Sequence, residues 1–252
     1  MFVVHQLAAE RKKALASVRL RFTKIKGKVS GGTATSAFEI AAKAGDAKVR
    51  RVLGNPYSLD PEGSARVKVR DSQMPRFDET SKHWLGPFFM APVNTRVVRR
   101  SAALIGSYGP SFTYDEVIDT GPGARGWYYA ARQSALMLGL VGVMVTPGVA
   151  ALAKSLAPKP GDGPTPEERA RGSFRGEIDA FTDDGARILG RVAGTSDPGY
   201  GETSKMLAES ALCLALDPIP KTGGVLTPAS CMGEALVKRL RDAKMTFSAE
   251  WA

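Results

Sequence analysis

Three glycines in residues 121–126 (GPGARG) have the spacing that brings a backbone turn close to a dinucleotide pyrophosphate. The stretch follows an extended segment at 112–119 and precedes an expected helix. In a dinucleotide site the next strand ends in an acidic residue that binds the ribose, about 20 residues downstream. Here no Asp or Glu occurs between Asp119 and Asp162, and three acidic residues in 112–119 would repel a pyrophosphate. We therefore expect a glycine turn between a strand and a helix, not a cofactor site.

A second glycine-rich segment, Ser30, Gly31, Gly32 and Thr33, lies between an expected strand and an expected helix. Backbone N–H groups and hydroxyls at a helix N-terminus can bind an anion or a developing oxyanion. We therefore predict substrate binding by these four residues. A tight turn with ordinary helix capping explains the same residues equally well.

Asn94 and Arg96 are further candidates for substrate binding, because an amide and a guanidinium can fix a phosphate or carboxyl group by two hydrogen bonds. The neighbouring Arg99 and Arg100 are expected to lie on a solvated helix face.

Tyr200 and Lys205 together could donate a proton, and they are the weak catalytic candidates of the chain. Their spacing does not place them on one helix face, which favours a turn tyrosine and a surface lysine. No metal site is expected, because the two histidines are far apart and the two cysteines lie among apolar residues.

The composition is that of a folded domain: 252 residues, of which 43% are hydrophobic. The net charge of +10 favours an anionic partner, such as an anionic membrane surface, a phosphate-bearing cofactor or an acyl carrier. Nucleic acid is not expected as a partner, since the basic residues are scattered and no aromatic residues alternate with them.

The hydrophobic pattern predicts an α/β or α+β domain, in which helices flank a mixed sheet. Polar residues at 61–87 predict a long surface loop, and Thr182 to Gly185 predict the turn of a hairpin. The other expected elements are an N-terminal helix to about residue 16, strands at 17–25, 112–119 and 245–251, a helix with the capping box Ser36/Glu39, a helix at 90–101 capped by Asn94 or Thr95, a helix ending near 216, and a helix from Thr227 to 243.

Residues 130–157 form an apolar segment, in which 133–153 carry no charge. About 20 apolar residues can span a bilayer, but two glycines and the sequence Thr146-Pro147-Gly148 interrupt a straight helix. We expect an apolar helical hairpin that packs in the core, with contact to a lipid surface as the alternative. Residues 158–172 are expected to be a Pro/Gly-rich linker or loop.

Six segments together resemble the saccharopine dehydrogenase-like oxidoreductases, in particular those of the trans-acting enoyl reductase type. Their order and spacing match across nearly the whole chain. The segments are 28–33 (KVSGGT), 55–61 (NPYSLDP), 90–101 (MAPVNTRVVRRS), 158–164 (PKPGDGP), 197–200 (DPGY) and 223–233 (GGVLTPASCMG).

The resemblance implies the substrate-binding and C-terminal portion of such an enzyme as a single domain over 1–252, without the N-terminal dinucleotide-binding domain. It implies an NAD(P)H-dependent reductase of acyl or lipid-like substrates, with no tight cofactor binding by this chain alone. The alternative is a non-catalytic module that binds lipid or membrane and has lost its cofactor domain. A cytoplasmic location, with contact to membrane or lipid, and a homodimer are further expectations.

Overall fold

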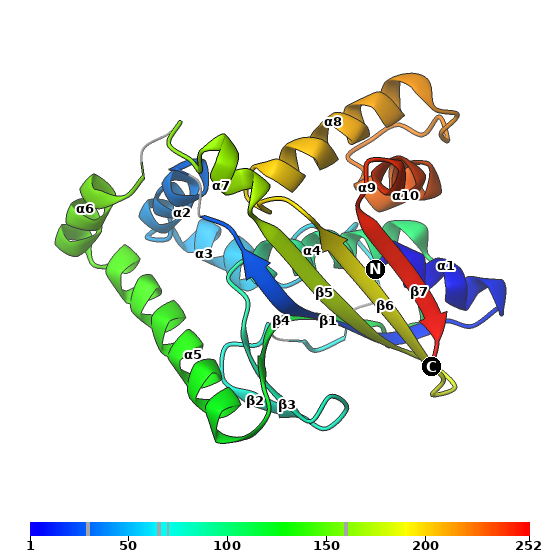
Figure 1. Ribbon diagram of the computed structural model, residues 1–252, viewed down its shortest axis with the longest axis horizontal. Coiled ribbons are helices and arrows are strands. Elements are labelled where there is room, and N and C mark those ends of the chain that lie inside the picture. The colour runs from blue at the N-terminus through cyan, green and yellow to red at the C-terminus, as the bar shows by residue number, and fades with distance from the viewer. Residues whose placement is uncertain (29–30, 65–66, 70, 159–160) are drawn as a thin grey trace.

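The described residues form a seven-stranded mixed sheet with helices around it (Figure 1). The computed structural model describes residues 1–28, 31–64, 67–69, 71–158 and 161–252. The strand order is β2-β3-β4-β1-β5-β6-β7; β1 and β4 pair in parallel and the other neighbours pair antiparallel. The strands are β1 (Leu15–Lys26), β2 (Arg76–Asp78), β3 (His83–Pro87), β4 (Thr113–Gly121), β5 (Ser173–Thr182), β6 (Arg187–Gly194) and β7 (Thr246–Trp251). The expected α/β class with a mixed sheet is confirmed.

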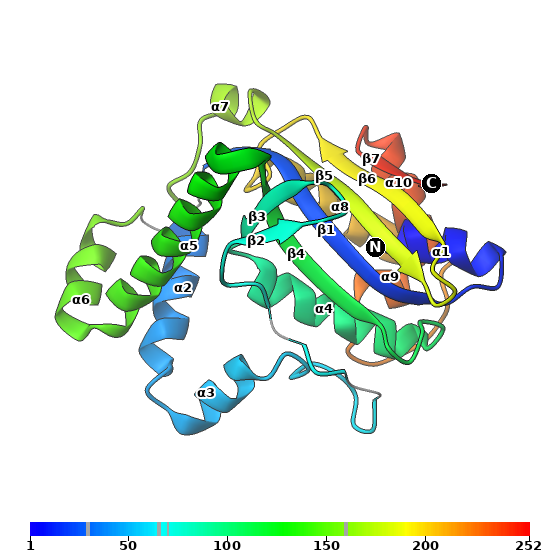
Figure 2. The same ribbon diagram turned by 90° about the horizontal axis from the view of Figure 1, so that it is seen from below.

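Several helices cover one face of this sheet, and Figure 2 shows β1, β5 and β6 in front with α4, α8, α9 and α10 behind them. The helices are α1 (Phe2–Glu10), α2 (Gly31–Lys43), α3 (Ala47–Gly54), α4 (Ala91–Ile105), α5 (Gly123–Val145), α6 (Pro147–Leu156), α7 (Pro166–Ala170), α8 (Gly201–Leu216), α9 (Pro228–Cys231) and α10 (Gly233–Asp242).

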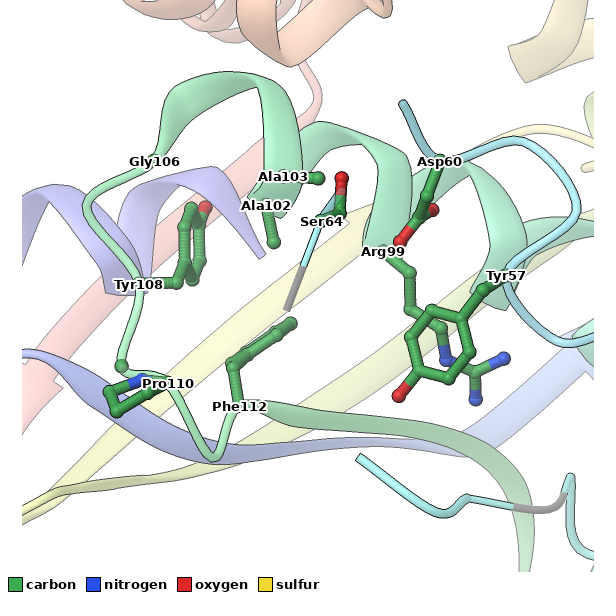
Figure 3. Close-up of a pocket in the computed structure, with 11 residues that line it drawn as sticks. Tyr57, Asp60, Ser64, Arg99, Ala102, Ala103, Gly106, Tyr108, Pro110 and Phe112 are labelled. Carbon is green, nitrogen blue, oxygen red and sulfur yellow. The ribbon is translucent and has the colours of Figure 1, made fainter. Parts of the chain in front are cut away.

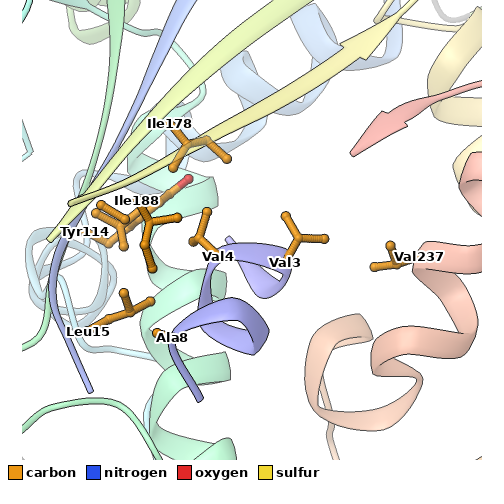
Figure 4. Close-up of a cluster of buried hydrophobic side chains, with 10 residues drawn as sticks. Val3, Val4, Ala8, Leu15, Tyr114, Ile178, Ile188 and Val237 are labelled. Atoms are coloured by element: carbon orange, nitrogen blue, oxygen red, sulfur yellow. The ribbon is translucent and has the colours of Figure 1, made fainter. Parts of the chain in front are cut away.

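The main core lies between this face and α1 (Figure 4). Val18 of β1 is paired with Tyr114 of β4 and with Ala180 of β5, so all three side chains point to the helix side of the sheet. Val4 of α1 is fully buried against them, together with Ile178. The alternation expected for β1 is confirmed, and it fixes which face the helices cover.

The hairpin of β2 and β3 corrects the expected surface loop at 61–87. Arg76 bonds to Asp115 on β4, at 2.5 Å, and Asp78 bonds to Arg19 on β1. The two strands therefore curl over the helix-free face of the sheet (Figure 2). Arg76 and Asp78 point to this charged face, whereas Phe77 and Trp84 pair on the opposite face with their ring centroids 5.5 Å apart. The polar residues of β2 thus face the sheet, which is the reverse of the usual pattern, and the sequence therefore resembles a polar loop.

The capping box expected at Ser36 and Glu39 is wrong, because both residues lie inside α2. The helix begins at Gly31, whose N–H donates to the carbonyl of Asp162 at 3.1 Å. A distant segment thus satisfies one of the N-terminal donors that a local side chain was expected to satisfy.

The cap expected at Asn94 or Thr95 is also wrong. Helix α4 begins at Ala91, with Met90 in the N-cap position and Pro92 in the first turn. Proline suits this turn because its missing N–H would have no helical acceptor there. The Thr95 hydroxyl donates to the carbonyl of Ala91 at 2.7 Å.

Helices α5 and α6 form the apolar helical pair, with a bend of 110° between Gly123–Met144 and Gly148–Leu156. The expected core packing is wrong: Leu136, Leu138 and Leu152 are 55%, 54% and 63% exposed. Among the described residues no single helix is long and apolar enough to cross a membrane. By length and composition alone, the bent pair could do so.

Two shorter elements also differ from the sequence expectation. The Thr227 hydroxyl caps α9 as expected, but the helix is broken before Gly233, which has φ +47° and begins α10. A short helix, α7, lies within the expected linker; Thr165 and Glu168 form its capping box.

Candidate functional site

Three distant segments meet at the edge of the sheet where β1 ends and β5 begins (Figure 1). They comprise residues 27–28 and 31–33, residues 161–172, and residues 194–202, and we call their meeting point the motif junction. Each of them overlaps one of the segments that carry the family resemblance, namely 28–33, 158–164 and 197–200. The hydrogen bond between Gly31 and Asp162 joins the first segment to the second.

A buried aspartate, Asp197, holds the motif junction together. It is fully buried, and its carboxylate accepts hydrogen bonds from the backbone N–H of Lys28 at 3.1 Å and of Tyr200 at 2.7 Å. The backbone N–H of Asp197 donates to the carbonyl of Arg169 at 2.9 Å. One residue therefore connects all three segments.

Glycines permit this close approach. A Cβ added at Gly27 would lie 2.2 Å from the carboxylate of Asp197, and one at Gly172 would lie 2.3 Å from its backbone nitrogen. A Cβ at Gly163 would lie 2.6 Å from the ring of Tyr200. These glycines are needed because the backbone of one segment packs directly on the backbone or side-chain atoms of another, with no room for a further side chain.

Of the four glycine-segment residues predicted to bind substrate, Gly31, Gly32 and Thr33 form the first turn of α2 at the motif junction. Ser30 lies outside the described residues. The first N–H groups of a helix have no acceptor within the helix and carry its positive dipole end. Asp162 accepts one of them, from Gly31, and the turn has the chemistry expected of an anion or oxyanion site.

The two catalytic candidates also lie at this edge, at the start of α8. The phenol of Tyr200 donates to the carbonyl of Asp162 at 3.3 Å. The amine of Lys205 lies 2.8 Å from a carboxylate oxygen of Glu202, which is fully buried and accepts from the backbone N–H of Ser196. Each candidate thus has its own partner, and their catalytic role stays a prediction.

Asn94 and Arg96 lie on α4, away from the motif junction. The amide of Asn94 donates to Glu116 at 2.9 Å, and the guanidinium of Arg96 donates to Asp71 at 3.1 Å and to the carbonyl of Leu53 at 2.7 Å. Both side chains therefore bond to groups of this chain, and their assignment to substrate stays a prediction.

The expectation that Arg99 is solvated is wrong. Its side chain is 4% exposed and donates to Asp71 and to the carbonyl of Tyr114, both at 3.1 Å. These acceptors come from segments distant in sequence, so the charge can be buried.

A cavity of about 190 Å³ lies beside Arg99, between α4 and the residues that follow it (Figure 3). Tyr57, Tyr108 and Phe112 contribute its aromatic wall. Burial raises the pKa of Tyr108, so its phenol stays protonated at neutral pH. The cavity is smaller than the 300–1,000 Å³ that is usual for ligand pockets, and we assign it no ligand.

A network of charges on the helix-free face of the sheet is absent from the sequence expectations. Arg21 donates to Asp119 at 2.5 Å and to Asp179 at 2.9 Å, and each of these three side chains is at most 12% exposed. The alternation of Arg19 and Arg21 along β1 was the only sequence signal, and it indicated a solvated face. The described residues contain no group of three His, Cys, Asp or Glu that could hold a metal ion.

The glycine turn at 121–126 joins β4 to α5, as expected. The N–H of Gly121 donates to the carboxylate of Asp119 at 3.0 Å, and a Cβ at Gly126 would lie 2.0 Å from the carbonyl of Gly121. An amide needed for a pyrophosphate is thus occupied by a carboxylate, which would repel that ligand. These residues do not fit a dinucleotide, and their glycines serve the packing of the helix on the strand.

Comparison of sequences relates the chain to mycobacterial proteins. It is 38% identical over 240 residues to a Mycobacterium tuberculosis protein named as a candidate trans-acting enoyl reductase, and the match covers 88% of this chain and 56% of that protein. It is 34% identical over 232 residues to the trans-acting enoyl reductase of Mycobacterium ulcerans, with 87% and 55% covered. The chain has homologues among the enoyl reductases. It is also 34% identical over 231 residues to the trans-acting enoyl reductase of Mycobacterium bovis.

The chain spans a little over half the length of these enoyl reductase homologues. No family model matches the sequence, and no solved structure matches it.

Proposed function

We propose that the chain is the substrate-binding portion of an enoyl reductase of the saccharopine dehydrogenase-like type, which reduces an α,β-unsaturated acyl substrate with NAD(P)H. The observation that supports this most is the motif junction. It joins three of the segments that carry the family resemblance through the buried carboxylate of Asp197. The names of the homologues supply the class of reaction.

Reduction of an enoyl thioester moves a hydride to the β-carbon and a proton to the α-carbon, while the negative charge develops on the carbonyl oxygen. A nicotinamide supplies the hydride and is oxidised to NAD(P)⁺. No residue of this chain is assigned to that cofactor, since the glycine turn at 121–126 does not fit one. The contribution of this chain is the site for the carbonyl oxygen.

The first turn of α2 is the proposed site for that oxygen. The N–H of Gly31 already donates to Asp162, and this bond fixes the direction of the helix. The donors proposed for the oxygen are therefore the next N–H groups of the first turn, beginning with that of Gly32, which carries no side chain of its own. Preorganised backbone donors of this kind stabilise an oxyanion because they need no reorganisation during the reaction. Tyr200, beside Asp162, is the proposed proton donor.

The experiment is equilibrium binding of 2-hexadecenoyl-coenzyme A to the purified chain, measured by calorimetry for the native chain and two variants. Gly32→Asp places a carboxylate on the positive end of α2, where it stabilises the helix but competes with an anionic ligand. Binding should weaken by about tenfold or more, with the unfolding temperature unchanged or raised. Ala42→Asp adds the same charge on the exposed part of α2, far from its start, and should leave binding unchanged.

Two results would contradict the proposal. Equal affinity for coenzyme A alone would show that the net charge of +10, not the enoyl group, selects the ligand. Equal binding by Gly32→Asp and the native chain would exclude the first turn of α2. A chimera of the Mycobacterium tuberculosis homologue, with this chain in place of its matched portion, tests reduction itself through the loss of NADPH absorbance.

A further inference from the structure

The bent pair of helices α5 and α6 projects from the body of the protein (Figures 1 and 2). We call residues 133–156 the elbow. Its apolar side chains are exposed to solvent: Leu138 and Val141 are each 54% exposed, Leu152 is 63% exposed and Leu156 is 79% exposed. A set of apolar side chains this exposed marks a surface that binds something apolar.

The exposed residues of α5 do not lie on one stripe. Leu136, Leu138, Leu140 and Val141 are all at least 46% exposed, and at 100° per residue they point to different sides of the helix. A helix that packs on a protein surface needs only one apolar stripe, whereas a helix that is apolar all round is surrounded by an apolar medium.

Both ends of the elbow are tied to the rest of the chain. Lys154 of α6 forms an ion pair with Glu39 of α2 at 2.9 Å, and α2 packs against both α5 and α6. Two of its hydroxyls bond within the elbow: Thr146 donates to the carbonyl of Gly142 at 2.9 Å, and Ser155 to the carbonyl of Leu152 at 2.7 Å. Such internal bonds are what a segment needs where water cannot supply partners.

The dimensions of the elbow fit one leaflet of a bilayer. The 12 residues from 133 to 144 have a helical length of about 18 Å at 1.5 Å per residue. Half of the hydrocarbon core of a bilayer is about 15 Å thick. After this length the chain bends by 110° at the Thr146-Pro147-Gly148 sequence, so α6 turns away instead of continuing to the other leaflet.

The charges around the elbow select an anionic lipid surface over an apolar protein partner. No acidic residue occurs between Asp119 and Asp162, while Arg125 and Arg132 are exposed on the first half of α5. Trp127 on the same half is 50% exposed, and Tyr128 and Tyr129 next to it are exposed as well. Aromatic and basic residues just before an apolar segment are typical of the headgroup region.

We propose that the elbow inserts into a single leaflet of an anionic lipid bilayer and anchors the protein there without spanning it. This inference is independent of the proposed reductase activity, because it concerns a different surface and is tested without substrate.

The test is co-sedimentation of the purified chain with vesicles of phosphatidylcholine alone, or of phosphatidylcholine and phosphatidylglycerol in equal parts. The native chain should bind the anionic vesicles more tightly than the neutral ones. Leu138→Asp should weaken this binding by about tenfold or more, because a leucine loses its apolar contact and a charge must enter the leaflet. Leu214→Asp, at a leucine of α8 that is 55% exposed, is the matched control and should bind like the native chain.

The depth to which the elbow enters the leaflet is measured with Leu138→Trp. The fluorescence of this additional tryptophan should be quenched more by lipids brominated deep in the acyl chain than by lipids brominated near the headgroup. Equal losses for Leu138→Asp and Leu214→Asp, or equal binding to neutral and anionic vesicles, would overturn the proposal. The absence of binding to anionic vesicles would also overturn it, and a dimer that Leu138→Asp dissociates would then show that a second copy covers the elbow.

Discussion

Replacing Asp197 by alanine removes the acceptor that connects the three segments of the motif junction. The backbone N–H groups of Lys28 and Tyr200 would lose their bonds to it, at 3.1 Å and 2.7 Å. Each buried donor left without a partner costs about 1–3 kcal/mol, so the loss of both partners in Asp197→Ala should lower the free energy of unfolding by about 2–6 kcal/mol. Domains of this kind have about 5–15 kcal/mol in total, and the variant should still fold.

Asp197→Asn should have a smaller effect on the free energy of unfolding. Its amide oxygen can accept one of the two hydrogen bonds, while its NH₂ group faces the other N–H and cannot accept from it. We expect about half of the loss seen for alanine. The measurement is urea unfolding followed by circular dichroism, with thermal unfolding as a second readout, in which 1 kcal/mol corresponds to about 2–4 °C at this chain length.

The matched control is Asp242→Ala, which removes an aspartate from an exposed ion pair with Lys238. We expect a change within about 0.5 kcal/mol, since exposed pairs contribute little. If Asp197→Ala lost less than about 1 kcal/mol, or no more than Asp242→Ala, the burial argument for the motif junction would be refuted.

Two further predictions concern packing and pH. Gly172→Ala should destabilise the fold by more than about 2 kcal/mol, because its Cβ would lie 2.3 Å from the backbone of Asp197. The control is Gly45→Ala, whose Cβ meets open space and which should leave the free energy of unfolding unchanged. Chemical unfolding of both variants measures the difference. Burial lowers the pKa of His5, which bonds to Ser107 at 3.0 Å and stacks on Tyr108, so the unfolded chain binds a proton more readily. The contribution of neutral His5 to the free energy of unfolding is therefore complete above about pH 6.5 and is lost as the pH falls below that value. Thermal unfolding from about pH 7.5 to 5.5 should show a smaller loss of stability for His5→Gln than for the native chain. An equal loss in both proteins would refute the role assigned to His5.

The strands and hairpin that the sequence predicted share one property: their pattern is local. The alternation of Val18 and Arg19 in β1 identified the buried face, and Thr182 to Gly185 identified the turn between β5 and β6. Hydrophobic period and turn chemistry depend on residues close together in the chain, so they can be read before any tertiary contact is known.

The wrong predictions share the opposite property, because a distant residue decided each of them. Gly31 begins α2 five residues before the expected cap since Asp162 accepts its N–H, and Arg99 is buried since Asp71 neutralises it. The motif junction depends on Asp197, which in the sequence is only the first residue of the segment 197–200, with no predicted role of its own. Tertiary partners of this kind leave no periodic signal, and a site that consists of them can be located only in the folded structure.

Helix α2 connects the two proposals. Its first turn, at Gly31 and Gly32, is the proposed site for the carbonyl oxygen of an acyl substrate, and Glu39, two turns further along, holds Lys154 of the elbow. The eight-residue separation from Gly31 to Glu39 corresponds to about 12 Å along the helix, a distance that a long acyl chain can span. If both proposals hold, an acyl chain that leaves the leaflet beside the elbow meets the reducing site by moving along one helix. Vesicle-bound protein should then bind a membrane-resident enoyl lipid more tightly than the Leu138→Asp variant does, while both bind a short, soluble enoyl thioester equally well.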